Sequence, residues 1–379
     1  MELSGTYDVV ITGGGLAGLS LSILLAQKDY SVLLVEKEQY PFHRVCGEYL
    51  SRESENFLAS MGIDLAALGA APVSKLEFST GKGRSLQQSL PLGGYGISRY
   101  LLDNELAGIA RGLGVTILAG TRTTGITEEL GFFRTDTTAG IFRSRLTTGS
   151  FGKRSNLDIS WQRPFVKGTR LPLNNYLGIK YHLEGDFPVD TVSLHLFRKG
   201  YAGLVAIENG LYNFCYLTAA DNLKNAGNSI ERMEREILGS NPVIRDILAR
   251  GRKTEARPVT ISQVSFEKKE QVEHGMLMLG DAAGLIAPLC GNGMSMALHS
   301  SKISAQLMES FLQGGMDRDE MNRQYVREWN RNFSSRLTTG RLLQSALARP
   351  LLANSLVGMG TAFPGLIRQL IRRTHGRPF

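Results

Sequence analysis

Residues 7–36 read YDVVITGGGLAGLSLSILLAQKDYSVLLVE, and this stretch decides the fold. Its first apolar run, YDVVIT, ends at three glycines, and residues 16–26 then have the composition and spacing of a helix. A second apolar run, SVLLVE, completes the order strand, turn, helix, strand of a parallel βαβ unit. We therefore expect an α/β fold that opens with a Rossmann-like domain.

The glycines of the first turn follow the pattern Gly13-x-Gly15-x-x-Gly18, in which each glycine has its own physical task. Gly13 makes the turn, Gly15 lets a pyrophosphate approach the backbone, and Gly18 allows the helix and the strand to pack closely. The helix start adds unpaired N–H groups for phosphate oxygens, so Leu16 and Ala17 belong to the expected binding residues.

A carboxylate ends the second strand of this unit. Glu36 stands where it can accept both hydroxyls of an adenosine ribose, and Lys37 follows it. The glycine pattern alone is weak evidence, but the two strands and Glu36 together with it predict a dinucleotide site.

A second glycine-rich segment lies far along the chain. The run MLML at 276–279 predicts a buried strand that leads into Gly280-Asp281, and a second turn then opens a helix that extends to Leu307. We expect Asp281 to accept hydroxyls of a sugar-alcohol chain and the helix N-terminus to face negative charge. The residues predicted to bind at this end are Asp281, Pro288, Gly291, Gly293 and Met294.

Between these segments the pattern changes from helical spacing to period two. Residues 159–271 mostly alternate apolar and polar positions, which predicts an inserted antiparallel β-sheet that would bind the substrate. We divide the chain into a cofactor domain (1–72, 97–158 and 272–310), a substrate domain (73–96 and 159–271) and a helical C-terminal region (311–379).

The formal net charge of +8 is confined to the tail, because residues 321–379 alone carry ten arginines against Glu328. This distribution argues against nucleic acid as a partner. Aromatic residues every fourth position from Tyr325 predict a helix that packs onto the body. Residues 364–373 resemble a basic amphipathic helix, for which contact with an anionic membrane surface and docking on the protein itself are both open.

The three cysteines, Cys46, Cys215 and Cys290, are too few and too scattered for a disulfide framework. We therefore expect free thiols and a cytoplasmic protein, and the spacing of histidines and cysteines predicts no metal site. We also expect no secretory leader, and the sequence shows no apolar run of the ~20 residues that a membrane-spanning helix needs.

With both glycine-rich segments in view, the sequence resembles the flavoproteins of the p-hydroxybenzoate hydroxylase fold, over about residues 5–375. That superfamily includes aromatic monooxygenases, geranylgeranyl reductases and flavin-dependent halogenases. Residues 44–48, RVCGE, resemble a stretch of the geranylgeranyl-reductase-like branch, and residues 97–103 resemble a helix start whose arginine contacts FAD. The resemblance implies FAD as the cofactor, with Arg44, Cys46 and Arg99 beside it. Cys46 is also the one candidate for a catalytic side chain, with simple packing as the alternative.

Two departures from the superfamily bear on the reaction. Phe151 replaces the aspartate of a motif that is linked to both FAD and NAD(P)H, which puts direct reduction by NAD(P)H in question and makes a reductase partner an alternative. Residues 200–206 lack the aromatic-rich segment of the reductase branch. We expect an FAD-dependent monooxygenase that hydroxylates an aromatic or polyketide-like small molecule. The alternatives are a reductase or dehydrogenase acting on C–C bonds of a long apolar substrate, and a flavoprotein that acts on or escorts a protein partner.

Overall fold

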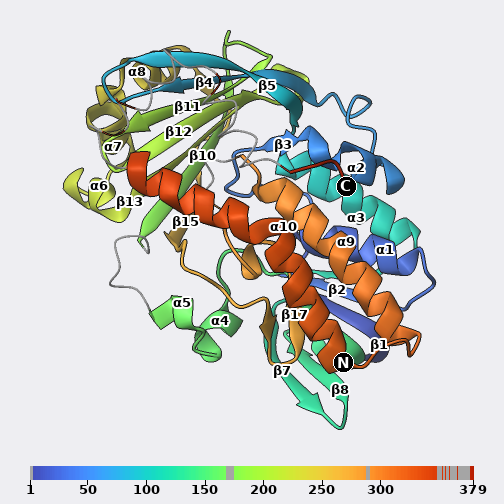
Figure 1. Ribbon diagram of the computed structural model, residues 1–379. Coiled ribbons are helices and arrows are strands. Elements are labelled where there is room, and N and C mark those ends of the chain that lie inside the picture. The colour runs from blue at the N-terminus through green and yellow to red at the C-terminus, as the bar shows by residue number, and fades with distance from the viewer. Residues whose placement is uncertain are drawn as a thin grey trace.

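The computed structural model describes residues 3–167, 175–286, 291–347 and 376–379, with isolated positions at 352, 355, 358 and 365. Two large β-sheets lie next to each other, and helices cover their outer faces (Figure 1). Pro288 lies outside the described residues, as does the basic segment 364–373 apart from Gly365. Membrane contact through that segment therefore stays a prediction.

The first sheet has the predicted βαβ unit at its centre. Its parallel strands follow the order β17, β9, β1, β2, β6, with β16 antiparallel at one edge and the hairpin β7–β8 joined to β9. The strands are β1 (Leu3–Thr12), β2 (Val32–Glu36), β6 (Thr116–Ala119), β7 (Thr123–Glu129), β8 (Phe132–Thr137), β9 (Gly140–Gly149), β16 (Val272–Glu273) and β17 (Met276–Met278). Every residue of β2 is buried, as expected for a parallel strand covered on both faces. The predicted α/β class is confirmed.

Three helices cover one face of this sheet and lie side by side in Figure 1. They are α1 (Leu16–Ala26), α3 (Arg99–Gly112) and α9 (Gly293–Leu312). In α1 nearly every residue is buried, because the sheet lies beneath it and α3 and α9 flank it. A short helix, α2 (Glu55–Ser60), follows the strand at Tyr49–Ser51 and a single 3-10 turn.

The second sheet has nine strands within the described residues, in the order β14, β10, β13, β12, β11, β4, β5, β3, with β15 also paired to β10. The strands are β3 (Tyr49–Ser51), β4 (Ala71–Ser79), β5 (Ser85–Gly96), β10 (Tyr176–Glu184), β11 (Thr191–Phe197), β12 (Gly200–Ala206), β13 (Tyr212–Ala219), β14 (Arg252–Lys253) and β15 (Val259–Val264). The predicted antiparallel β-sheet is present, and among its described pairs β4 and β11 differ by running parallel. More than a hundred residues separate these two strands, so the connection is long enough for a parallel crossover.

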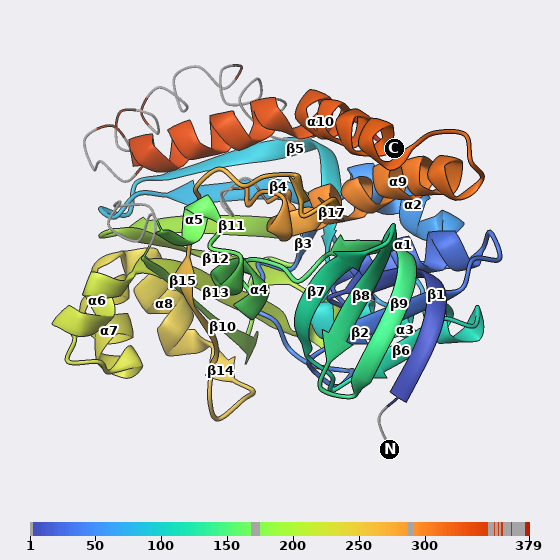
Figure 2. The same ribbon diagram turned by 90° about the horizontal axis from the view of Figure 1, so that it is seen from below.

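The two faces of the second sheet have different neighbours, because side chains alternate along each strand. On one face, Leu204, Phe214 and Tyr216 pack against α6 (Ala220–Asn225), α7 (Ile230–Glu236) and α8 (Pro242–Arg250). Figure 2 shows these helices beneath the sheet, with α10 on its opposite side. On the other face, Leu196, Tyr201 and Leu217 form a separate apolar cluster. This is the face on which α10 lies.

The long helix α10 (Arg318–Leu347) joins the two sheets on the outside. The Tyr325 hydroxyl donates to the Met278 carbonyl of the first sheet at 2.7 Å, and Leu347 packs against the apolar cluster of the second sheet. Tyr325, Trp329 and Phe333 are all buried, which confirms that this stripe packs onto the body. No helix in the described part of the chain is long and apolar enough to cross a membrane.

The predicted domain boundaries differ from the sheets in two places. β3 lies within residues 1–72 yet pairs with β5 of the second sheet. The helix α4 (Asn156–Ser160) straddles the boundary at 158, and its Leu157 packs with Ile126 and Phe133 of the first sheet. After it, α5 (Pro164–Lys167) leads toward the second sheet. The chain crosses between the sheets more often than a division by sequence pattern suggests.

Candidate cofactor and substrate site

A cavity of about 930 Å³ lies between the two sheets. It is lined by nearly all residues that the sequence assigned to cofactor binding. These are Gly13, Gly15, Leu16, Ala17, Glu36, Lys37, Arg44, Cys46, Arg99, Asp281, Gly291, Gly293 and Met294. Gly18 is not among the lining residues, and Pro288 lies outside the described residues. One cavity therefore brings together segments from both ends of the chain.

Gly13 and Gly18 set how closely helix α1 approaches the first sheet. Gly13 has φ +107°, and a Cβ there would lie 2.5 Å from the Ser150 carbonyl oxygen. A Cβ on Gly18 would lie 2.0 Å from the Gly13 carbonyl oxygen. Neither contact is physically tolerable, so both positions require glycine. Gly18 acts behind the cavity by packing, not at its surface.

The N-termini of α1 and α9 both open into the cavity, at Gly15 and at Gly293. The two helices can lie this close because small residues meet between them, with the Ser20 and Ser301 hydroxyls 2.6 Å apart. The N–H groups in the first turn of a helix have no partner within that helix. Two such ends beside one cavity form a favourable environment for negatively charged groups.

Asp103, which the sequence analysis did not identify, holds two arginines at the cavity. It is buried on α3 and accepts from Arg99 Nε at 2.7 Å and from Arg44 Nε at 3.1 Å. Arg44 also donates to Glu36 at 3.0 Å, and the Gly14 N–H donates to the same carboxylate at 2.8 Å. Burial alone would lower the pKa of Arg99, but the Asp103 carboxylate opposes this effect through its charge and its hydrogen bonds. The pKa of Arg99 is raised above its usual value overall, and Arg99 stays charged. The spacing of four residues between Arg99 and Asp103 was the available signal.

Lys269 holds the second glycine-rich segment through hydrogen bonds to backbone carbonyl groups. Its Nζ donates to the carbonyl oxygens of Asp281 and Lys153, each at 2.7 Å, and lies 4.4 Å from the centre of the Phe165 ring. Burial lowers the pKa of Lys269 to about 8, although the nearby carboxylates of Asp158 and Asp281 oppose that shift. The lysine ties the strand end at Asp281 to the loop that follows Phe151.

The opposite wall of the cavity comes from the second sheet and is mostly apolar. Among the described residues it includes Leu76, Leu90, Val192, Leu194, Tyr201, Leu217, Ile261 and Val264. Where Gly203 of β12 pairs with Cys215 of β13, both side chains are small, which leaves room in front of the sheet. Burial raises the pKa of the Cys215 thiol to about 12, so this thiol stays protonated.

A buried ionic cluster lies at one edge of this wall. Glu48, which has no exposed surface, contacts Lys180 Nζ and lies 2.8 Å from His182 Nε2. The Arg99 N–H also donates to Glu48 at 2.8 Å. Burial raises the pKa of Glu48, but Lys180 and His182 together lower it below its usual value, so the carboxylate is ionised. Burial and then the Lys180 charge lower the pKa of the neighbouring His43.

Cys46 and Phe151 also line the cavity. The carbonyl oxygen of Cys46 accepts from Asn213 Nδ2 at 3.1 Å, and its thiol is free. Phe151 is half-buried, with its ring 6.3 Å from that of Trp161 in a tilted arrangement. The aromatic side chain therefore fills space at the position where the superfamily motif has an aspartate.

Comparison with known families agrees with this geometry. Residues 6–139 match the model of an FAD binding domain, and they contain the glycine turn, Glu36, Arg44 and Arg99. The chain is an FAD-dependent oxidoreductase. Residues 236–347 of this flavoprotein also match the model of squalene epoxidase. The resemblance to the p-hydroxybenzoate hydroxylase fold is confirmed.

Curated and solved relatives of the flavoprotein are distant. It is 23% identical to a digeranylgeranylglycerophospholipid reductase of Methanoculleus marisnigri, with 98% of this chain and 96% of the relative covered. It is 22% identical to a tryptophan 2-halogenase of Chondromyces crocatus, with 88% and 67% covered. A flavin-dependent brominase superimposes with a TM-score of 0.78 at 17% identity, over 97% of this chain and 93% of the brominase. At these identities the structural likeness shows the fold.

The residues around the cavity fit FAD. The glycine turn and the first turn of α1 offer backbone N–H groups at the cavity surface, where a Cβ on Gly15 would have only an Arg99 nitrogen, at 3.5 Å, within van der Waals range. Glu36 stands at the end of β2 as a hydroxyl acceptor, and Asp281 supplies a second carboxylate to the lining. FAD would supply the two-electron chemistry, while the chain supplies binding, orientation and exclusion of water.

Proposed function

We propose that the flavoprotein is a monooxygenase that hydroxylates an apolar small molecule, aromatic or polyketide-like. One observation carries the proposal. Among the described residues, the lining that the second sheet contributes contains no Asp, Glu, Lys, Arg or His. Such a wall excludes water and orients an apolar substrate, and the part of it that the structure describes contributes no carboxylate, ammonium, guanidinium or imidazole group. Hydroxylation needs the exclusion of water more than it needs a charged general acid or base from this wall.

The reaction balances with two external electrons. One atom of O2 enters a C–H bond of the substrate, the other leaves as water, and two electrons and two protons are consumed. Reduced FAD supplies the activation of O2. The chain's part is to hold the substrate against the apolar wall near Leu194, Tyr201 and Leu217, on the side that faces Cys46 and Phe151.

Isotope labelling tests the proposal. The reduced protein is mixed with ¹⁸O2 and a panel of aromatic and polyketide-like compounds, and the products are analysed by mass spectrometry. We expect a product that carries one ¹⁸O atom. A product formed without O2, with two added hydrogens and no label, would contradict hydroxylation.

The second candidate is a reductase that acts on C–C double bonds of a long apolar substrate. Cys46 favours it, because a free thiol in the lining could give the proton that accompanies hydride transfer from the flavin. The likeness to digeranylgeranylglycerophospholipid reductases points the same way. Under argon, a reductase would saturate an isoprenoid substrate, and Cys46→Ala would slow that reaction strongly.

The source of electrons forms a further part of the proposal. A phenyl ring cannot accept a hydrogen bond from a ribose hydroxyl as a carboxylate can, so we propose that a partner reductase delivers the electrons. Loss of a charge-assisted hydrogen bond costs ~1.5 to 3 kcal/mol, or about ten- to a hundredfold. Direct flavin reduction by NADPH or NADH in a stopped-flow instrument should be slow, and Phe151→Asp should accelerate it. Rapid reduction of the unaltered protein at low nicotinamide concentration would exclude the need for a partner.

A further inference from the structure

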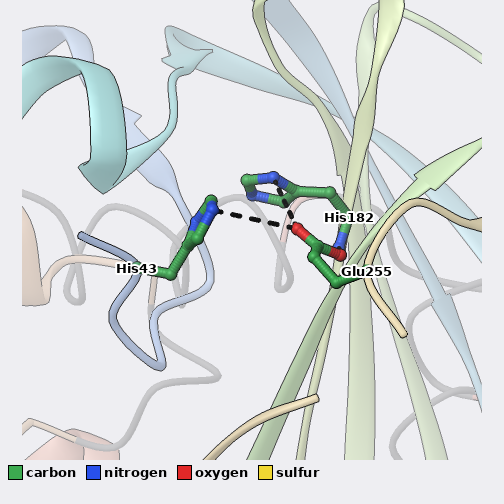
Figure 3. Close-up of side chains that lie close together, drawn as sticks. All are labelled: His43, His182 and Glu255. Atoms are coloured by element: carbon green, nitrogen blue, oxygen red, sulfur yellow. Dashed lines mark hydrogen bonds and ion pairs between the residues drawn. The ribbon is translucent and has the colours of Figure 1, made fainter. Parts of the chain in front are cut away.

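Three side chains that are far apart in the sequence meet beside the cavity (Figure 3). His43 comes from the loop after β2, His182 from β10, and Glu255 from the segment between β14 and β15. His182 Nδ1 lies 3.5 Å from Glu255 Oε1, and His43 Nε2 lies 3.9 Å from the same oxygen. One ligand atom from each residue lies within 4.8 Å of the other two. Two imidazoles and a carboxylate thus converge on one point.

Hydrogen bonds on the outer side fix how two of these groups face that point. His182 Nε2 lies 2.8 Å from Glu48 Oε2, and because an ionised carboxylate only accepts, Nε2 carries the hydrogen. The Nδ1 atom of a neutral His182 then presents its lone pair toward Glu255. In turn, Glu255 Oε2 accepts from the His182 backbone N–H at 3.0 Å, which leaves Oε1 facing the histidines. A carboxylate behind a ligating histidine is the usual outer partner in metal sites.

Ordinary pairing does not account for His43. Its distance of 3.9 Å to Glu255 is too long for a hydrogen bond, and its Nδ1 is buried without a hydrogen-bond partner in the described part of the chain. The ring is held by stacking on Tyr100, with centroids 4.6 Å apart and planes inclined by 25°. His43 is therefore oriented toward the cluster without making a hydrogen bond there.

We propose that His43, His182 and Glu255 bind one divalent transition-metal ion, with Zn²⁺ as the probe. Two histidines and one glutamate are a ligand set that Zn²⁺ uses in sites with an open fourth position. Bond lengths of about 2.0 to 2.2 Å in a tetrahedron put neighbouring ligand atoms about 3.4 Å apart. The pair at 3.5 Å already meets this spacing, and the pairs that involve His43, at 3.9 Å and within 4.8 Å, would have to shorten when the ion binds. The side chains of His43 and Glu255 are 30% and 28% exposed, so the ion can enter and keep a water ligand.

The ion would join the loop that lines the cavity to the second sheet and the segment beside it. His43 lies next to Arg44 and three residues before Cys46 in that loop, whereas His182 lies on β10 and Glu255 in the segment between β14 and β15. Metal binding would therefore hold this loop against the sheet. We infer a bound ion that regulates or stabilises the cavity wall; this inference does not depend on which reaction the flavin carries out.

The test uses the full-length, FAD-loaded protein after removal of metal by a chelator. Zn²⁺ binding is titrated by calorimetry. Co²⁺ is added in a separate experiment, because its absorption at wavelengths longer than the flavin bands reports the coordination geometry. We expect one ion per chain and a Co²⁺ spectrum of four- or five-coordinate type. His43→Ala and Glu255→Gln should each weaken Zn²⁺ binding by more than about 100-fold, since even outer-shell changes cost about 10- to 100-fold.

His274→Ala is the matched control, because His274 is a histidine with a 54% exposed side chain beside Glu273, away from the three ligands. It should bind Zn²⁺ like the unaltered protein. FAD content and melting temperature without metal show whether each variant is folded. If His43→Ala does not fold, Glu255→Gln tests the proposal in its place. The proposal fails if the unaltered protein takes up no stoichiometric Zn²⁺, or if a folded ligand variant binds it as tightly as His274→Ala does.

Discussion

The two walls of the cavity are built under different physical constraints. The wall from the first sheet brings backbone close to backbone, so that a single added carbon at Gly13 or Gly18 would collide with a carbonyl oxygen. The wall from the second sheet presents side chains such as Leu194 and Leu217, which need only be apolar and of suitable size. Cofactor binding is therefore tied to particular residues, whereas substrate selection is spread over a surface that tolerates exchange.

The first prediction tests this difference by replacing glycine with alanine at one position in α1 and at one position in α3. Gly18→Ala puts a Cβ 2.0 Å from the Gly13 carbonyl oxygen, so α1 must move off the sheet. We expect a loss of about 3 kcal/mol or more in the free energy of unfolding, together with loss of bound FAD. Thermal melting and the FAD content of the purified protein measure both effects.

Gly108→Ala is the control for that experiment. Gly108 is an exposed residue of α3, and a Cβ there meets nothing within 4 Å. Alanine should stabilise this helix by about 0.5 to 1 kcal/mol. If Gly18→Ala and Gly108→Ala kept FAD equally well, close packing at the first wall would not be what cofactor binding requires.

The second prediction concerns the charge beneath the first wall. The pKa of Lys269 falls from 10.5 in the unfolded chain to about 8 in the folded protein, so between these pH values only the unfolded chain binds the proton. The stability of the unaltered protein should therefore rise with pH across this window, by about 3 kcal/mol relative to Lys269→Met. Denaturation with urea below pH 8 and near pH 10.5 measures the difference. A flat difference for Lys269→Met would show that the ammonium group of Lys269 is not desolvated.

The same difference between the two walls explains which parts of the site could be predicted from the sequence. The position of the glycine turn, Glu36 and Asp281 at the cavity could be predicted, because it depends on local backbone geometry that leaves a short motif. Asp103 was missed, although its spacing from Arg99 on one helix face could have revealed it. The apolar wall and the parallel pairing of β4 with β11 could not be predicted, because they depend on which distant strands meet. His43, His182 and Glu255 share no motif spacing, so the sequence alone could not show that these three side chains lie close together.

The third prediction tests the far end of the first wall. Asp281→Ala removes a hydroxyl acceptor at the end of β17 without removing core volume, since Asp281 is only half-buried. FAD should bind about 10- to 100-fold more weakly, while the melting temperature of the FAD-free protein stays the same. Equilibrium dialysis against free FAD gives the affinity. Exposed Asp319 on α10 provides the control, and unaltered FAD affinity in Asp281→Ala would remove this residue from the cofactor site.

The smallest effect is expected at the second wall. Leu194 lies on β11, is half-buried and faces the cavity, so Leu194→Ala enlarges the space for the substrate without touching a backbone turn. FAD content should be unchanged, and the affinity for apolar aromatic ligands, followed through the flavin absorption, should fall by about tenfold. Leu130→Ala, at a position that is 96% exposed, should change neither. If Leu194→Ala released FAD instead, the second wall would contribute to cofactor binding as directly as the first, and the separation of the two walls by function would no longer hold.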